Sequence, residues 1–397
     1  MKLTFASAVR RFLFVAAVCV SVASFASGKH YVMYVGTYTG KGSEGIYAYR
    51  YDAGSGTVSP IGLAAKTDNP SFLAVAAGRK FLYAVHETHD YQGQASGGVA
   101  AFAIDRVTGK LEKLNEVASR GADPCFISFD RSGKYLLVAN YSGGNVAVLP
   151  ILSDGRLGEA SSVVKDEGPL GPNKERQEAA HAHWVETTAG NRFAYVADIG
   201  LDRVLIYKFD SSNGLLSSGD PGAVKTTTDK SVFSATLAPG TGPRRVAFSS
   251  DGRFMYVLGE MDSTVTVFAN DKKESFRSIQ KISTLPAGFS GDNTGAEIAM
   301  HPNGKFLYTS NRGDDSIALF SIDHSSGKLA FIDRFPTHGK QPRFFTLDPS
   351  GSRLLVANQS TGNIVELKIN PATGRLTSAG EVAKVSSPVS IVFVDED

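Results

Sequence analysis

The sequence repeats one two-strand phrase seven times, and this repetition limits the possible folds more than any other feature. Two clear copies begin at Asn69-Pro70-Ser71 and Gly242-Pro243-Arg244. Equivalent residues of the second strand are separated by 49, 54, 58, 61, 52 and 48 residues. They are Tyr34, Tyr83, Leu137, Tyr195, Tyr256, Tyr308 and Val356. A period of about 50 residues, with four strands in each unit, is typical of a β-propeller.

The pattern inside each unit is that of antiparallel strands. Short runs of Val, Ile, Tyr, Phe and Leu alternate with turns of Gly, Asp and Asn, and helical periodicity is almost absent. The first complete unit predicts strands at 71–75, 81–86, 98–104 and 111–117. Tight turns such as Ala77-Gly78-Arg79, Ser132-Gly133-Lys134 and Asp251-Gly252-Arg253 place glycine where a positive φ is needed.

The strands predicted at the two ends of the chain together make up one blade. The N-terminal unit supplies strands at 31–37, 45–51 and 58–64 but lacks a first strand, and the C-terminus supplies an extra one at 388–394. Pairing these ends in one blade closes the ring and removes its open edges. The sequence therefore predicts an all-β single domain at residues 30–397, a seven-bladed β-propeller with four-stranded antiparallel blades.

Residues 1–26 have the pattern of a secretory signal peptide. Lys2, Arg10 and Arg11 precede an apolar run at 12–22, and Ser24-Phe25-Ala26 fits a small-x-small cleavage site. The protein is thus expected to be exported, periplasmic or secreted, with no stable membrane insertion after cleavage. An uncleaved N-terminal anchor is the alternative, although the apolar run is short for a membrane span.

Charge and cysteine content narrow the possible partners. The formal charge is +2, and removing the three N-terminal cations leaves −1, whereas a nucleic-acid binder needs a basic face. The chain after the signal retains Cys125 alone, so it has no internal disulfide and is held together by packing. We expect a small-molecule ligand and a monomer.

Two columns of the repeat become charged at one end of the predicted ring. In a four-stranded blade, the start of strand one and the end of strand two share a face, which also carries the long segments 88–97, 161–180, 220–241 and 284–294. The columns read Ser71, Cys125, His183, Arg244, Ala296 and Arg343, then Glu87, Tyr141, Ile199, Glu260, Arg312 and Gln359. Such a ring is either a set of mutually satisfied ion pairs or a receptor for an anionic or polyhydroxylated ligand, and we favour the second.

Several motifs resemble one family, the 6-phosphogluconolactonase-like lactonases with seven-bladed propellers, which are related to carboxy-muconate lactonizing enzymes. The motifs are Tyr34-Val35-Gly36-Thr37-Tyr38-Thr39, 138–146, Glu175-Arg176-Gln177, His181-Ala182-His183, Gly242-Pro243-Arg244, Asn311-Arg312 and Gln341-Pro342-Arg343. The resemblance implies a catalytic His, Arg, Glu and Arg, which fall on His183, Arg244, Glu260 and Arg312. It implies no metal and no cofactor. Candidate substrate-binding residues are His181, Arg343, Glu87, Asn140 and Asn311.

The implied reaction is hydrolysis of a sugar δ-lactone. Glu260 or His183 would activate water and the other would return a proton to the leaving oxygen, while Arg244 and Arg312 would stabilise the oxyanion. Arg343 would hold a distal phosphate or hydroxyl group. The choice of His183 over His181 rests on the column alignment.

Two other functions fit the same sequence. One is a non-catalytic periplasmic propeller that binds a ligand or acts as a scaffold, and the other is a lactonizing or isomerising enzyme of the muconate type. An export signal also conflicts with 6-phosphogluconolactone as substrate, because that compound is made inside the cell. An unphosphorylated gluconolactone is therefore a second candidate substrate.

Overall fold

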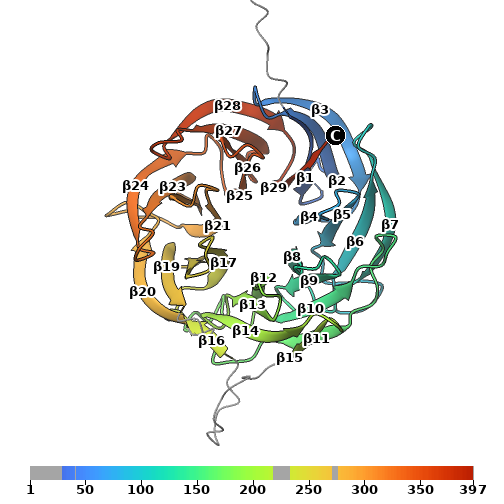
Figure 1. Cartoon of the computed structure of the whole chain (residues 1–397), viewed down its shortest axis with the longest axis horizontal. Coiled ribbons are helices and arrows are strands. Elements are labelled where there is room, and N and C mark those ends of the chain that lie inside the picture. The colour runs from blue at the N-terminus through green and yellow to red at the C-terminus, as the bar shows by residue number, and fades with distance from the viewer. Residues whose placement is uncertain (1–28, 41, 218–232, 271–275, 397) are drawn as a thin grey trace, which may run out of the picture.

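The chain forms a ring of seven antiparallel sheets around a central axis (Figure 1). The computed structural model describes residues 29–40, 42–217, 233–270 and 276–396, so the predicted signal peptide lies outside the described residues. Within these ranges no helix has the length and hydropathy needed to cross a membrane. The predicted seven-bladed propeller is confirmed.

The blades are numbered here in chain order, and their strands are given from the channel outward. Blade 1 is β29 (Pro388–Asp395), β1 (His30–Thr37), β2 (Gly45–Asp52) and β3 (Thr57–Lys66). Blade 2 is β4 (Leu73–Val75), β5 (Phe81–His86), β6 (Gly98–Ile104) and β7 (Leu111–Ala118). Blade 3 is β8 (Pro124–Phe129), β9 (Tyr135–Asn140), β10 (Asn145–Pro150) and β11 (Ser162–Lys165).

The remaining blades follow the same order. Blade 4 is β12 (Ala182–Thr187), β13 (Phe193–Asp198), β14 (Arg203–Asp210) and β15 (Leu215–Ser217), with β16 (Phe233–Thr236) also pairing with β14. Blade 5 is β17 (Pro243–Phe248), β18 (Phe254–Gly259), β19 (Thr264–Asn270) and β20 (Phe276–Ser283). Blade 6 is β21 (Thr294–Met300), β22 (Phe306–Arg312), β23 (Ser316–Ile322) and β24 (Leu329–Pro336). Blade 7 is β25 (Pro342–Leu347), β26 (Arg353–Asn358), β27 (Asn363–Ile369) and β28 (Leu376–Lys384).

The two ends of the chain close the ring as predicted. β29 pairs antiparallel with β1, from Tyr31 opposite Asp395 to Thr37 opposite Pro388. Ile391 of β29 is buried against Met33 and Val35 of β1. Blade 1 is thus assembled from residues at opposite ends of the sequence.

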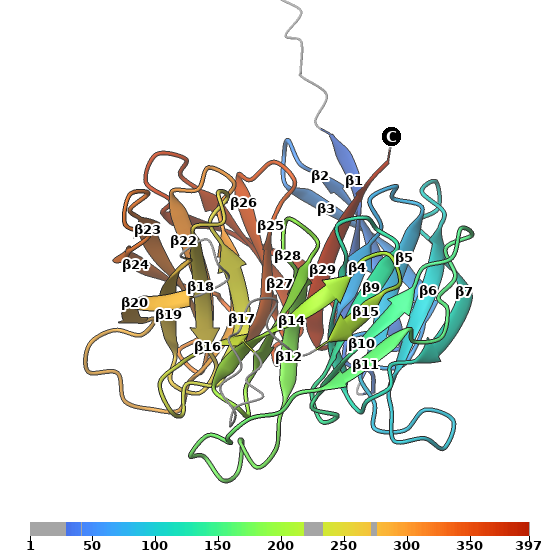
Figure 2. The ribbon, with the colours of Figure 1, turned by 60° about the horizontal axis from the view of Figure 1, so that its bottom comes forward.

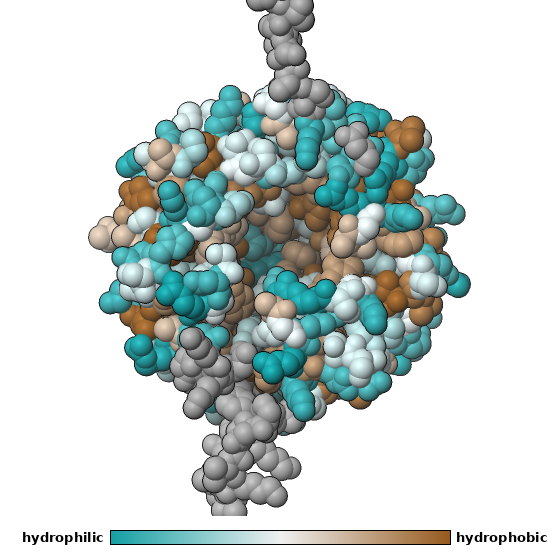
Figure 3. Space-filling model, viewed as in Figure 1, coloured by the Kyte–Doolittle hydropathy of each residue, from teal (hydrophilic) through white to brown (hydrophobic). Residues whose placement is uncertain are grey.

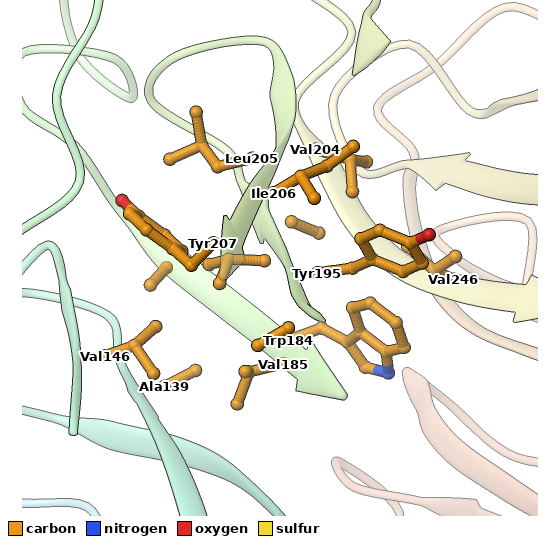
Figure 4. Close-up of a cluster of buried hydrophobic side chains, with 14 of the residues drawn as sticks. Ala139, Val146, Trp184, Val185, Tyr195, Val204, Leu205, Ile206, Tyr207 and Val246 are labelled. Carbon is orange, nitrogen blue, oxygen red and sulfur yellow. The ribbon is translucent and has the colours of Figure 1, made fainter. Parts of the chain in front are cut away.

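The apolar core lies between neighbouring blades. In the close-up of Figure 4, Trp184 and Val185 of β12 lie near Ala139 and Val146 of blade 3 and Val246 of blade 5. The alternating side chains of each strand face the adjacent sheets, so every blade is buried on both faces. This packing explains the apolar runs of the second strands, such as Phe193–Asp198.

The structure differs from the sequence-based expectation at two places. The segment 220–241, expected as a long loop, contains the strand β16, which pairs with β14 from Arg203 to Ile206. The outer edge of β14 is therefore divided between two short strands. In the turn at Ala77-Gly78-Arg79 the positive φ belongs to Arg79 at +56° and not to the glycine, whereas Gly133 and Gly252 adopt it as predicted.

The long loops gather on one face of the ring. In Figure 2 the segments at 88–97, 161–180 and 284–293 project together from the lower edge, and the C-terminus lies on the opposite side. Figure 3, in the view of Figure 1, shows the face that carries the C-terminus, where the surface is hollowed at the centre of the ring and bordered by both hydrophobic and hydrophilic residues. The long loops, and the strand ends that they adjoin, lie on the other face.

Ring closure should depend on the side chains that β29 inserts into the core. We expect Ile391→Ala to lower the free energy of unfolding by about 2–5 kcal/mol, the usual cost of removing a large aliphatic side chain from a core. Val107→Ala, at an 81% exposed residue, is the control and should change it by less than about 0.5 kcal/mol. Guanidinium unfolding followed by fluorescence measures the stability of both variants. Equal unfolding midpoints would contradict a stabilising role for the packing of β29 against β1.

Candidate active site

A β-bulge recurs near the start of the inner strand in blades 3 to 7. The ladder between strands one and two changes register at Pro124/Phe126, Ala182/Trp184, Pro243/Arg245, Gly295/Ile298 and Pro342/Phe344. The bulges leave out of the ladder Cys125, His183, Arg244, Ala296 with Glu297, and Arg343. A bulge reorients its extra side chain and bends the strand. The first charged column of the sequence is therefore a column of bulged residues.

Three of the bulged residues, Cys125, His183 and Arg343, line a cavity of about 320 Å³. Its lining contains five of the predicted site residues: Glu87, His183, Glu260, Arg312 and Arg343. It also contains five residues that the sequence analysis did not assign to the site: Tyr38, Cys125, Tyr141, Arg176 and Thr294. The cavity is therefore polar on most sides, with cations on opposite walls.

Glu260 is the centre of the charge arrangement. Its Oε1 accepts a hydrogen bond from Arg176 Nη2 at 2.5 Å, and its Oε2 lies 2.8 Å from Arg244 Nε and 3.0 Å from Arg312 Nη2. Burial alone would raise the pKa of Glu260, but Arg312, Arg244 and Arg176 outweigh it and hold that pKa far below its usual value. The carboxylate is therefore permanently ionised and a weak base.

Arg244 lies behind the cavity and is not part of its lining. Its side chain is 1% exposed, and besides Glu260 it contacts the carbonyl oxygen of Ala296. Burial, Arg312 and Arg343 lower the pKa of Arg244 to about 9, so it keeps its charge at neutral pH. The structure thus makes Arg244 a support for Glu260, which differs from the direct contact with substrate that the sequence analysis expected.

His183 is the one histidine in the cavity lining. Its Nδ1 is buried and has no hydrogen-bond partner among the described residues, and its ring meets Tyr141 edge-on at 5.9 Å between centroids. Burial, together with Arg244, Arg245 and Arg343, lowers the pKa of His183 well below 6.5. The imidazole is therefore neutral at neutral pH and has a nitrogen able to accept a proton, although burial and the nearby guanidinium groups make it a weaker base than an exposed histidine.

The opposite wall carries a second hydrogen-bonded group. Tyr38 donates from its hydroxyl to the Glu87 carboxylate, at 2.8 and 2.9 Å from its two oxygens, and Ser71 also donates to Glu87. Arg343 Nη2 donates to the Tyr38 hydroxyl at 2.7 Å, and its guanidinium lies 5.3 Å from the Tyr38 ring centroid. Tyr38 belongs to the opening motif of the chain, and this motif was the signal that could have identified it.

The other predicted binding residues lie outside the cavity lining. His181 stacks on Tyr141 at 4.5 Å and bonds to Glu178 and to the Tyr141 carbonyl, so it supports the wall from behind. Asn140 and Asn311 are fully buried and donate to the carbonyls of Ser119 and Thr284, which follow the last strand of the preceding blade. They join neighbouring blades and do not face a ligand.

Arg176 reaches the cavity from the long segment before blade 4. It bonds to Glu260 and lies 3.3 Å from the Tyr141 hydroxyl. No repeat column contains it, because the segment has no counterpart in other blades. Within the described ranges no group of three or more His, Cys, Asp or Glu residues is arranged to hold a metal ion.

Comparison with known proteins agrees with this architecture. Residues 32–393 match the family described as lactonase, 7-bladed β-propeller. A 6-phosphogluconolactonase of Bacillus subtilis is 36% identical, with 92% of this chain and 99% of the relative covered. One from Formosa agariphila is 32% identical over 90% of this chain and 98% of its own length.

A solved structure extends the comparison. The periplasmic gluconolactonase of Pseudomonas aeruginosa superimposes with a TM-score of 0.83 at 32% identity, covering 92% of this chain and 99% of that one. The family match spans all seven blades and every residue of the cavity. The chain belongs to the lactonase family of seven-bladed β-propellers.

Proposed function

We propose that the protein hydrolyses the δ-lactone of a sugar acid. The observation that carries this proposal is the buried, neutral His183 in one cavity with Arg176, Arg312 and Glu260. The family and the relatives described as 6-phosphogluconolactonase and gluconolactonase support it. A polar cavity of about 320 Å³ falls in the lower part of the range of small-ligand sites.

His183 is the general base in this mechanism. It takes a proton from a water molecule as the water oxygen attacks the lactone carbonyl carbon. The resulting imidazolium then gives its proton to the ring oxygen as the bond between that oxygen and the carbonyl carbon breaks. The product is an open-chain hydroxy acid, and one histidine carries out both proton transfers.

Arg312 and Arg176 stabilise the negative charge that develops on the carbonyl oxygen. Both guanidinium groups line the cavity and are fixed by Glu260, so little reorganisation is needed when the oxyanion forms. Glu260 acts as their anchor and not as the base, since the same arginines suppress its basicity. Arg244 also binds Glu260, which supports the proposal that His183, and not Glu260, is the base.

The cavity wall formed by Tyr38, Glu87 and Arg343 binds the sugar hydroxyls in this mechanism. Glu87 accepts hydrogen bonds, Arg343 donates them, and the Tyr38 hydroxyl joins the two. Such mixed donors and acceptors suit a polyhydroxylated ring, which presents both functions at each carbon. They place the lactone carbonyl toward the arginines of the opposite wall.

The protein acts outside the cytoplasm in this proposal. Support comes from the signal-peptide pattern at residues 1–26 and from the relative described as a periplasmic gluconolactonase. The substrate would then be a lactone formed by oxidation of a sugar outside the cytoplasm. We also propose that the protein acts as a monomer.

Acid release tests the activity directly. Purified protein lacking residues 1–26 should accelerate hydrolysis of glucono-δ-lactone or its 6-phosphate above the spontaneous rate, followed by pH-stat titration. Each assay is corrected with heat-inactivated protein. Acceleration of neither lactone would overturn the proposal and favour a non-catalytic binding protein.

Replacing His183 and His181 in turn shows which of the two histidines is the general base and which only supports the cavity wall. His183→Gln should lower kcat by about 10²–10⁴, because it removes general acid–base catalysis. His181→Gln, whose ring lies outside the cavity lining, is the matched control and should keep kcat within about tenfold. A larger loss of kcat in the His181 variant than in the His183 variant would reverse the assignment.

The pH dependence of the wild type tests the same assignment. Here kcat/KM should fall only as the pH drops below 6.5, since the neutral imidazole is the active form and the pKa of His183 is lowered.

Removing the central anion should destabilise the whole site. Glu260→Gln leaves Arg176, Arg244 and Arg312 without their shared carboxylate, so we expect the free energy of unfolding to fall by about 3–5 kcal/mol. Glu175→Gln, at an exposed carboxylate with no ion pair to any described residue, should change little. Because the arginines of the Glu260 variant lack their carboxylate partner, inorganic phosphate should bind them and raise the melting temperature of this variant more than that of wild type. Equal shifts in melting temperature would contradict the view that Glu260 balances the charge of these arginines.

A further inference from the structure

The central cavity continues into a groove across the same face. A second cleft of about 490 Å³ shares Thr294 and Arg312 with the cavity. A third cleft of about 600 Å³ shares Ser360 with the second. The second cleft lies over blades 6 and 7, where the segments that precede β21 and β25 face the loops after β22 and β26. The depression thus runs from the axis toward the rim of the ring.

The second cleft has polar groups that are not used by the fold. Gln341 is fixed through its backbone N–H, 2.7 Å from Asp315 Oδ1, and through its Oε1, which accepts from Ser360 at 2.8 Å. Its Nε2 forms no hydrogen bond with any described residue, and neither do the side chains of Thr294 and Asp292. One amide donor, one hydroxyl and one carboxylate are therefore available to sugar hydroxyls.

The charge of the second cleft disfavours a phosphate group. Lys340 Nζ is 2.9 Å from Asp315 Oδ2, so its charge is balanced. Arg312 is bound to Glu260 and to the Gly295 carbonyl. Asp292 adds an unpaired negative charge, which repels a phosphate dianion but accepts hydrogen bonds from neutral hydroxyl groups. An uncharged, polyhydroxylated group fits these conditions.

We propose that the second cleft is a glycosyl subsite and that the preferred substrate is the δ-lactone of a disaccharide aldonic acid. The lactone ring occupies the central cavity, and the second sugar extends past Thr294 and Arg312 to Asp292 and Gln341. This inference rests on the proposed lactonase function. The third cleft gives room for a further sugar beyond Ser360.

A series of lactones tests the subsite. The protein without residues 1–26 is assayed by pH-stat with glucono-δ-lactone, its 6-phosphate and cellobiono-δ-lactone. We expect kcat/KM for the disaccharide lactone to be roughly tenfold higher than for glucono-δ-lactone, the gain from about two added hydrogen bonds. Gluconate and cellobionate, the open-chain products, are compared by calorimetry so that binding is measured without turnover.

Two variants and one control locate the effect. Gln341→Ala should lower the ratio of kcat/KM for the disaccharide lactone to that for the monosaccharide lactone by roughly threefold to tenfold. Asp292→Lys should raise the relative rate on the phosphorylated lactone. Gln94→Ala, at an exposed glutamine on the same face but outside the clefts, should leave every ratio unchanged.

The outcomes separate the subsite from the lactonase function. Hydrolysis of glucono-δ-lactone with no preference for the disaccharide, or an unchanged ratio in Gln341→Ala, overturns the subsite alone. Preference for the 6-phosphate over the disaccharide lactone in the wild type also overturns it. Hydrolysis of none of the three lactones overturns the function, and equal binding of gluconate and cellobionate would then overturn the subsite independently.

Discussion

The site depends on one buried carboxylate. Glu260 is 4% exposed and balances Arg176, Arg244 and Arg312, which come from different parts of the ring. Burying Glu260, Arg244 and Arg312 costs desolvation energy that a well-packed apolar cluster would avoid. The arrangement is therefore better explained by the need to present two oriented guanidinium groups to a ligand than by stability.

The β-bulges connect this cluster to the fold. A regular strand alternates its side chains between the two faces of a blade, and both faces are buried against neighbouring sheets. An inserted residue such as His183 or Arg343 leaves this alternation, so it faces the cavity without disturbing the apolar residues on either side. The blades can therefore keep one pattern of core residues while each contributes a different side chain at the axis.

The fold was predictable because the same strand pattern occurs seven times in the sequence. The site was predictable only for residues that belong to this repeated pattern. His183, Glu260, Arg312, Arg343 and Glu87 follow from the columns and all line the cavity. Arg176 comes from a segment that has no counterpart in the other blades, so no alignment of the blades identifies it. Tyr38 follows Tyr34 by four residues, as Glu87 follows Tyr83, so it belongs to the second column and could have been found there. Asn140 and Asn311 lie outside the cavity lining and bond to the preceding blade, because a residue at a strand end faces either the cavity or the next blade, and spacing alone does not separate these directions.

The closing pair of strands also sets the order of events during synthesis. Tyr31 and Asp395 are partners in blade 1, although nearly the whole chain separates them. Contacts between such distant residues form late and slowly, because a long loop must be ordered first. Blade 1 is not complete until β29 has left the ribosome. Until then β1 presents an unpaired edge, so the nascent chain must be kept from pairing with other strands while the blades between β1 and β29 are made.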